Sequence, residues 1–64
     1  MTELDEKIMA FLQASPSSAF NLSEISRAVG KAPPTIKRAI ERLEKIKKIM
    51  VIDKRSMKLV KIVG

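Results

Sequence analysis

Cationic side chains recur at helical spacing in the middle of the chain. Lys37, Arg38 and Arg42 lie between the apolar positions of residues 22–43, LSEISRAVGKAPPTIKRAIERL. A guanidinium can donate two parallel hydrogen bonds to the O6 and N7 atoms of guanine, and both Lys and Arg neutralise phosphates. The residue types therefore indicate binding to a polyanion, and the spacing indicates that a helix presents them.

The basic residues are concentrated in the C-terminal part of the chain. The 64 residues include 13 Lys and Arg against 7 Asp and Glu, and the formal net charge is +6. Residues 1–26 have a balance of −3, whereas residues 27–64 have a balance of +9. This separation is typical of proteins that bind nucleic acids. The alternative interpretation is a Lys-rich surface that only keeps the protein soluble.

The apolar spacing predicts three helices that would position these side chains. We expect them at about residues 3–14, 22–29 and 33–47. In the third helix, Ile36 and Leu43 belong to a stripe that should face the core. The cationic residues lie outside this stripe and would point to solvent.

Local signals mark the ends of the second and third helices. Asn21 and Glu24 form a capping-box pair, and Gly30 suits the left-handed residue that ends a helix. Pro33 and Pro34 fit the first turn of a helix, where their missing N–H groups cost nothing. Two short helices joined by a tight turn, with the second one basic, are typical of a helix-turn-helix, whose second helix enters the major groove of DNA.

A β-hairpin is predicted at about residues 49–63, after the third helix. Apolar stretches rich in β-branched residues flank a polar turn at residues 53–56, whose tip is basic. Apolar residues occupy successive positions in these stretches, so both faces of the hairpin would be apolar. With a very short strand at Ala19 and Phe20, the expected fold is mainly α with a small β-hairpin. Its order is helix, strand, helix, helix, strand, strand, in one domain over residues 1–64.

This order of elements resembles the winged-helix family of transcription regulators, especially the MarR-like and Lrp-like branches. The resemblance is carried by the pattern Leu22-x-x-Ile25-x-x-x-x-Gly30-x-x-x-x-Thr35-Ile36-Lys37-Arg38-x-Ile40-x-Arg42-Leu43-Glu44. It implies a winged helix-turn-helix, with the recognition helix at about 33–47 and the wing hairpin at about 49–63. The chain departs from the family at Lys47, where Gly is usual, and at Pro33 and Pro34, where small polar residues are common.

We expect double-stranded DNA to contact the third helix, the turn before it and the hairpin tip. The candidate residues are Lys31, Pro34, Thr35, Lys37, Arg38, Arg42, Lys45, Lys54, Arg55 and Lys58. Those on the first turns of the third helix would reach base edges, with Arg38 bonding to guanine. Lys31, Arg42 and Lys45 would hold phosphates. The hairpin tip would lie on the backbone, with Arg55 entering a narrow minor groove.

The composition argues against several other kinds of function. The chain has no Cys and no His, so we expect no metal site and no cofactor, and a Ser nucleophile would lack a base. We expect neither an enzyme nor a small-molecule ligand. No apolar run approaches the ~20 residues of a membrane span, and the acidic N-terminus is unlike a secretory signal. The expected location is the cytoplasm, in association with the nucleoid.

Two alternatives to a DNA-binding regulator use the same fold. One is a protein-interaction module of a larger transcription or replication assembly, although the basic third helix favours nucleic acid. The other is a protein that binds RNA or an unusual duplex; single strands are disfavoured because Trp and Tyr are absent. Homodimerisation is a further hypothesis. It would use the outer face of the hairpin or the outer side of the first helix with Met9.

Overall fold

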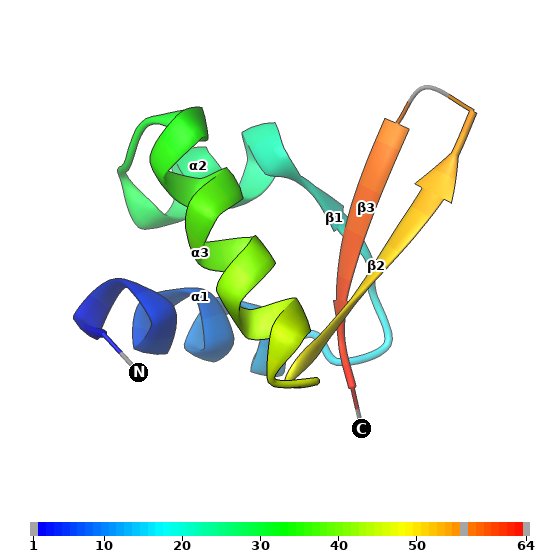
Figure 1. Cartoon of the computed structure of the whole chain (residues 1–64), viewed down its shortest axis with the longest axis horizontal. Coiled ribbons are helices and arrows are strands. Elements are labelled where there is room, and N and C mark those ends of the chain that lie inside the picture. The colour runs from blue at the N-terminus through cyan, green and yellow to red at the C-terminus, as the bar shows by residue number, and fades with distance from the viewer. Residues whose placement is uncertain (1, 56, 64) are drawn as a thin grey trace.

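Three helices and a three-stranded antiparallel sheet make up the computed structural model, which describes residues 2–55 and 57–63 (Figure 1). The helices are α1 (Glu3–Gln13), α2 (Leu22–Val29) and α3 (Pro33–Lys45). The strands are β1 (Phe20–Asn21), β2 (Ile49–Lys54) and β3 (Met57–Ile62). The order α1-β1-α2-α3-β2-β3 confirms the predicted fold class. Ser56 in the predicted turn, and Met1 and Gly64 at the ends of the predicted domain, lie outside the described residues.

Side chains just before α1 and α2 fix the first turns of these helices. The Thr2 hydroxyl accepts from the Asp5 N–H, and the Asp5 carboxylate accepts from the Thr2 N–H, both at 3.2 Å. The Asn21 amide oxygen accepts from the Glu24 N–H at 2.8 Å, and the Glu24 carboxylate accepts from the Asn21 N–H at 3.1 Å. Each capping box pairs backbone donors that a helix start leaves free.

The end of α3 lies at Lys45, two residues before the predicted end at about 47. Lys47 adopts the left-handed conformation, with φ 60, at the position where the resembling family has Gly. The Lys47 N–H donates to the Glu44 carbonyl and the Lys48 N–H to the Leu43 carbonyl, both at 3.0 Å. This is the hydrogen-bond pattern of a Schellman motif, which closes the helix. A residue other than Gly or Asn in this conformation costs about 1 kcal/mol.

The sheet has the strand order β1-β3-β2, and all its pairs are antiparallel. Val51 lies opposite Val60, and Phe20 of β1 lies on the other side of Val60. Val60 is fully buried, so this row of the sheet faces the helices. The Phe20 ring contacts the Phe11 ring of α1, with centroids 4.7 Å apart.

The core lies between the three helices and one face of the sheet. Its fully buried large side chains are Ile8, Leu12, Ile25, Ile36, Leu43 and Val60. Met9 belongs to the same cluster and is only 8% exposed, so the prediction that it lies on the outer side of the first helix was wrong. The buried residues of α1 are Asp5, Ile8, Met9 and Leu12, so Asp5 lies on the side of the helix that faces the core. An interface with a second copy therefore cannot rest on Met9 while the core is intact.

Candidate nucleic-acid interface

The outward side of α3 carries cationic residues because its apolar residues face the core. The buried residues of α3 recur at i, i+3, i+4 and i+7, and none is more than 4% exposed: Ile36, Ala39, Ile40 and Leu43. All the candidate DNA contacts on α3 are exposed: Pro34, Thr35, Lys37, Arg38, Arg42 and Lys45. The helix therefore separates packing residues from residues that a ligand can reach.

The hairpin of β2 and β3 is a wing whose tip lies at the same end of the molecule as the start of α3 (Figure 1). Lys54, Arg55 and Lys58 are all exposed on it. Arg55 has φ 57, a left-handed conformation that two-residue hairpin turns require. Arg55 thus places a cationic side chain at the tip in a backbone conformation that Gly or Asn would adopt at a lower energetic cost.

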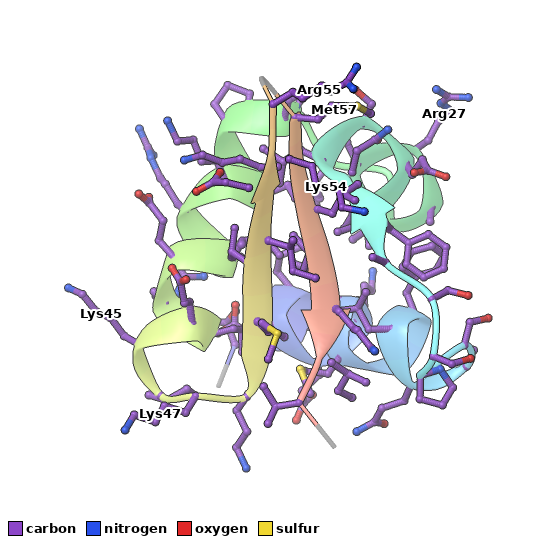
Figure 2. The ribbon with its side chains drawn as sticks, turned by 90° about the vertical axis from the view of Figure 1, so that its right-hand side faces the viewer. Arg27, Lys45, Lys47, Lys54, Arg55 and Met57 are labelled. Carbon is purple, nitrogen blue, oxygen red and sulfur yellow. The ribbon has the colours of Figure 1, made fainter. Side chains whose placement is uncertain are left out.

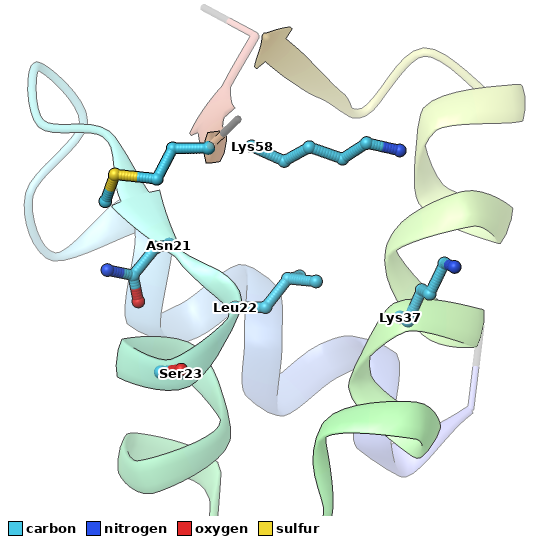
Figure 3. A pocket seen from close by; sticks show the side chains of 6 residues that line it. Asn21, Leu22, Ser23, Lys37 and Lys58 are labelled. Atoms are coloured by element: carbon cyan, nitrogen blue, oxygen red, sulfur yellow. The ribbon is translucent and has the colours of Figure 1, made fainter. Parts of the chain in front are cut away.

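An open hollow of about 450 Å³ lies between the start of α2, the first half of α3 and the wing (Figure 3). Its lining residues are Asn21, Leu22, Ser23, Lys37, Met57 and Lys58. Lys37 comes from α3 and Lys58 from β3, and Leu22 lies between them (Figure 3). The fold therefore brings together two ammonium groups that are far apart in the sequence.

Two candidate residues lie apart from the hollow, one at the far end of α3 and one on the side of the molecule that α1 forms. Lys45 is on the last turn of α3, and Figure 2 shows it at the opposite end of the sheet from Arg55. Lys31 follows α2 and lines a separate hollow with Glu3 and Lys7 of α1. Lys31 and Lys45 are both exposed, but the structure does not group them with the wing tip.

Arg42 forms an ion pair that ties α3 to α1. Its Nη2 donates to the Asp5 carboxylate at 2.9 Å; the Asp5 side chain is 6% exposed, whereas that of Arg42 is 50% exposed. Burial raises the pKa of the Asp5 carboxyl. The hydrogen bond from the Thr2 N–H, the hydrogen bond from Arg42 and the charge of Arg42 outweigh this effect. The pKa of Asp5 therefore lies below its ordinary value of 3.8, and the carboxylate stays charged in the folded protein.

The sequence does not predict this ion pair, because an acidic residue in the first turn of a helix is already explained by the positive end of the helix dipole. One signal was present. Positions 5, 8, 9 and 12 share helical spacing, so Asp5 occupies the first position of the stripe that continues with Ile8 and Leu12. A charge on such a stripe needs a partner of opposite sign, and the sequence does not reveal that Arg42 supplies it.

Most cations of α3 and the wing have no ion-pair partner among residues 2–55 and 57–63. Besides Arg42 and Asp5, the described part of the chain has one ion pair, between Lys7 and Glu3 at 3.8 Å. In the same residues, no group of three or more His, Cys, Asp or Glu side chains is arranged to hold a metal ion. No described helix is long and apolar enough to span a membrane.

Comparison with known proteins gives a family for most of the chain. The family model described as the AsnC-type helix-turn-helix domain matches residues 1–44, which include α1, α2 and nearly all of α3. A comparison with curated protein sequences gives no match.

Solved structures share the fold over the whole chain. A possible transcriptional regulator from Methanosarcina mazei superposes with a TM-score of 0.91 at 14% identity, over 100% of this chain and 57% of that one. A mutant of MepR from S. aureus, bound to an oligodeoxyribonucleotide, gives 0.90 at 18% identity, over 100% and 49%. Human N-acetylserotonin methyltransferase gives 0.73 at 9% identity, over 95% and 20%. The chain spans about half the length of the first two proteins. At these identities the likeness shows the fold, which proteins of different function share.

Proposed function

The chain belongs to the AsnC-type helix-turn-helix family, and on this premise we propose that it regulates transcription by binding double-stranded DNA through α3 and the wing. One observation carries the proposal. The exposed cations at the start of α3 and at the wing tip lie at the same end of the molecule, and Lys37 and Lys58 line one hollow there. A duplex offers phosphates and base edges to such a surface.

In this proposal the first turns of α3 enter the major groove. Arg38 is exposed and would donate two parallel hydrogen bonds to guanine, a contact worth about 1–3 kcal/mol of discrimination. Thr35 and Lys37 are exposed beside it and would contact neighbouring base edges, with Pro34 adding a small apolar contact. The apolar residues of α3 are buried in the core, so only the side of the helix that carries Arg38 and Lys37 can enter the groove.

The wing would lie on the adjacent backbone. Lys54 and Lys58 reach phosphates from the hairpin, and Arg55 enters the minor groove, where a narrow groove attracts cations. The left-handed backbone of Arg55 supports this role. Gly or Asn would be more stable in that position, and residues held in unfavourable conformations are concentrated at binding sites.

The remaining cations would hold the backbone farther from the centre of the site. Lys31 and Lys45 flank α3 at its two ends, and each would contact a phosphate and carry no sequence information. Arg42 uses one nitrogen for Asp5, and its half-exposed guanidinium keeps other donors for a phosphate. These contacts set the register of α3 in the groove.

Titration of labelled nucleic acids tests the proposed function. The probes are a random-sequence duplex, the same sequence as a single strand, and the matching RNA duplex, each followed by fluorescence anisotropy at low and moderate salt. We expect the DNA duplex to bind most tightly, with log affinity falling linearly with log salt because bound phosphates release counterions. Lys48→Ala, an exposed cation beyond the end of α3 and outside the proposed contacts, is a control for lost charge. Equal binding of all three probes, or no binding of the DNA duplex, contradicts the proposal.

A further inference from the structure

The two carboxylate oxygens of Asp5 hold two different groups. Oδ2 accepts from the Thr2 N–H at 3.2 Å, which is one half of the capping box of α1. Oδ1 accepts from Nη2 of Arg42 at 2.9 Å. Because the Asp5 side chain is buried, neither oxygen is free to turn toward solvent. Asp5 therefore joins the first turn of α1 to the C-terminal half of α3.

Arg42 and Lys37 lie on opposite flanks of the outward side of α3. Successive residues of an α-helix are turned by about 100°, so positions 37 and 42 are about 140° apart around the axis. Lys37 shares a hollow with Lys58 of the wing (Figure 3). Arg42 contacts Asp5 of α1 on the other flank. A duplex that lies along α3 can therefore be held from the wing on one side and from α1 on the other.

An open hollow of about 370 Å³ lies on the outward side of α3 beside Arg42. Its lining residues are Arg38, Glu41, Arg42 and Lys45. Three cations and one carboxylate give this hollow an excess of positive charge, which suits a phosphate of the DNA backbone. Arg42 is the cation of this hollow that a buried carboxylate holds in place.

The Arg42 guanidinium can hold Asp5 and a phosphate at the same time. It is planar and carries several N–H donors in fixed directions, and the bond to Asp5 uses one of them. The side chain is half-exposed, so a ligand can reach the group. Because the group is rigid, fixing Nη2 restricts the directions of the remaining donors. A free Arg gives up its rotational freedom when it binds, whereas Arg42 has already lost part of it.

The negative charge of Asp5 is balanced by its surroundings. An unpaired carboxylate near DNA would repel the phosphates. Asp5 is paired with Arg42 and lies in the first turn of α1, where the helix dipole is positive. Its repulsion of a phosphate is thus offset by the guanidinium that binds both groups, and the gain from a fixed Arg42 remains.

We infer that Asp5 is a positioning residue for DNA binding, whose carboxylate holds the Arg42 guanidinium on the α1 side of α3, where it receives a backbone phosphate. The inference rests on the proposed function and deepens it. α1 then contributes to binding without touching the duplex. The consequence has an unusual sign, because removing a negative charge from the protein should weaken its binding to a polyanion.

Asp5→Asn tests this sign with little change of shape. Asn keeps one oxygen for the Thr2 N–H, but its amide NH₂ is a donor and cannot accept from Arg42. The net charge rises from +6 to +7. We expect the affinity for a random-sequence duplex to fall about 5-fold, because binding must then order a free Arg side chain. The slope of log affinity against log salt should decrease by about 1, as one phosphate contact is lost.

Fluorescence anisotropy measures both quantities at a temperature where circular dichroism shows that each variant is folded. If Asp5 acted only through its charge, Asp5→Asn would bind more tightly than the wild type. Equal or tighter binding by Asp5→Asn overturns the inference and leaves the proposed function intact. No binding of the duplex by the wild type overturns both.

Thr2→Ala is the matched control for the stability of α1. It removes the hydroxyl that accepts from the Asp5 N–H, so it weakens the same capping box, but it keeps the bond between Asp5 and Arg42. We expect a lower free energy of unfolding with wild-type affinity and salt slope. A loss of affinity equal to that of Asp5→Asn would show that Asp5 acts only through the stability of α1, and this overturns the inference.

A double-mutant cycle tests whether Asp5 acts through Arg42. Arg42→Gln removes the guanidinium but keeps an amide donor for the buried carboxylate. In this background Asp5→Asn has no guanidinium to release, so we expect it to cause no further loss of affinity. The same loss in both backgrounds would mean that Asp5 acts independently of Arg42, and this outcome overturns the inference.

Discussion

The two ends of α3 carry the same kind of charge in different surroundings. Near the C-terminal end, Arg42 is hydrogen-bonded to a buried carboxylate of α1, and Lys47 closes the helix in a left-handed conformation. Near the N-terminal end, Lys37 and Arg38 are exposed, with no ion-pair partner in the described part of the chain. The ion-pair partner of a cation, and not only its position on the helix, therefore decides its role. Arg42, paired with Asp5, is an anchor that ties α3 to α1, whereas Lys37 and Arg38 are available for a ligand.

Removing the anchor should have the largest effect on stability. Asp5→Ala deletes the capping box of α1 and leaves Arg42 without its partner, and we expect a loss of about 2 kcal/mol in the free energy of unfolding. The loss stays below that of a fully buried ion pair because Arg42 is half-exposed. Urea denaturation measures it. Glu3→Ala is the control, since its pair with Lys7 is exposed and should contribute less than about 0.5 kcal/mol. Similar losses in both variants would remove the distinction between the two ends.

Replacing Arg38, at the N-terminal end of α3, should lower the affinity for DNA and leave the free energy of unfolding unchanged. We expect Arg38→Ala to lose about 1–3 kcal/mol of affinity for a preferred duplex, selected first from random sequence, and to discriminate less between sequences. Lys45→Ala should weaken all sequences about equally and reduce the salt slope by about 1. Anisotropy titrations on the selected and a scrambled duplex distinguish the two. If both variants lose the same affinity on both duplexes, the proposed division between base and phosphate contacts is wrong.

Acid should weaken the anchored end. The pKa of Asp5 is lower in the folded protein than its ordinary value of 3.8, so folding favours the charged carboxylate. The stability from this group is therefore fully present above pH 3.8 and is lost as the pH falls through the lower, folded-state pKa. Thermal unfolding between neutral pH and pH 2 should show a smaller acid-induced decrease in Asp5→Asn than in the wild type. Parallel curves for the two proteins would show that Asp5 does not carry this dependence.

The features that the sequence predicted well are local ones. Both ends of α2 are marked by residues within the helix or beside it, namely Asn21 with Glu24 and Gly30, and the structure has the capping box and the left-handed Gly. The apolar residues of α3 from Ile36 to Leu43 recur at helical spacing, and this spacing alone predicts which side of the helix is buried. The order of elements followed from such signals, because each depends on residues only a few positions apart.

The features that the sequence did not predict depend on contacts between distant segments or on a missing signal. Asp5 and Met9 lie on the buried side of α1, and Asp5 is paired there with Arg42, which is a contact between distant segments. Ile46 follows Leu43 at the spacing of the α3 stripe but is 54% exposed, because the helix ends before it at a turn where Lys47 stands in place of the usual Gly. Lys37 and Lys58 line one hollow only after the wing folds back beside α3.

The smallest effects should come from the two strained residues, and they offer the sharpest comparison of the two ends. Lys47 and Arg55 have φ values of 60 and 57, and both carry one positive charge on an exposed side chain. Replacing either by Gly relieves about 1 kcal/mol of strain, partly offset by the greater freedom of Gly in the unfolded chain. We expect Lys47→Gly and Arg55→Gly to raise the free energy of unfolding by about 0.5 kcal/mol each.

The two variants should differ in DNA binding although they lose the same charge. Lys47 lies at the opposite end of the sheet from the wing tip (Figure 2), so Lys47→Gly should leave affinity within about twofold of the wild type, because distant charges are screened by salt. Arg55→Gly removes the proposed minor-groove contact and should lower affinity several-fold more. Unfolding and anisotropy on the same two proteins check both parts. Equal affinities would mean that Arg55 acts only through its charge, and that its strained backbone serves the hairpin turn and not the DNA.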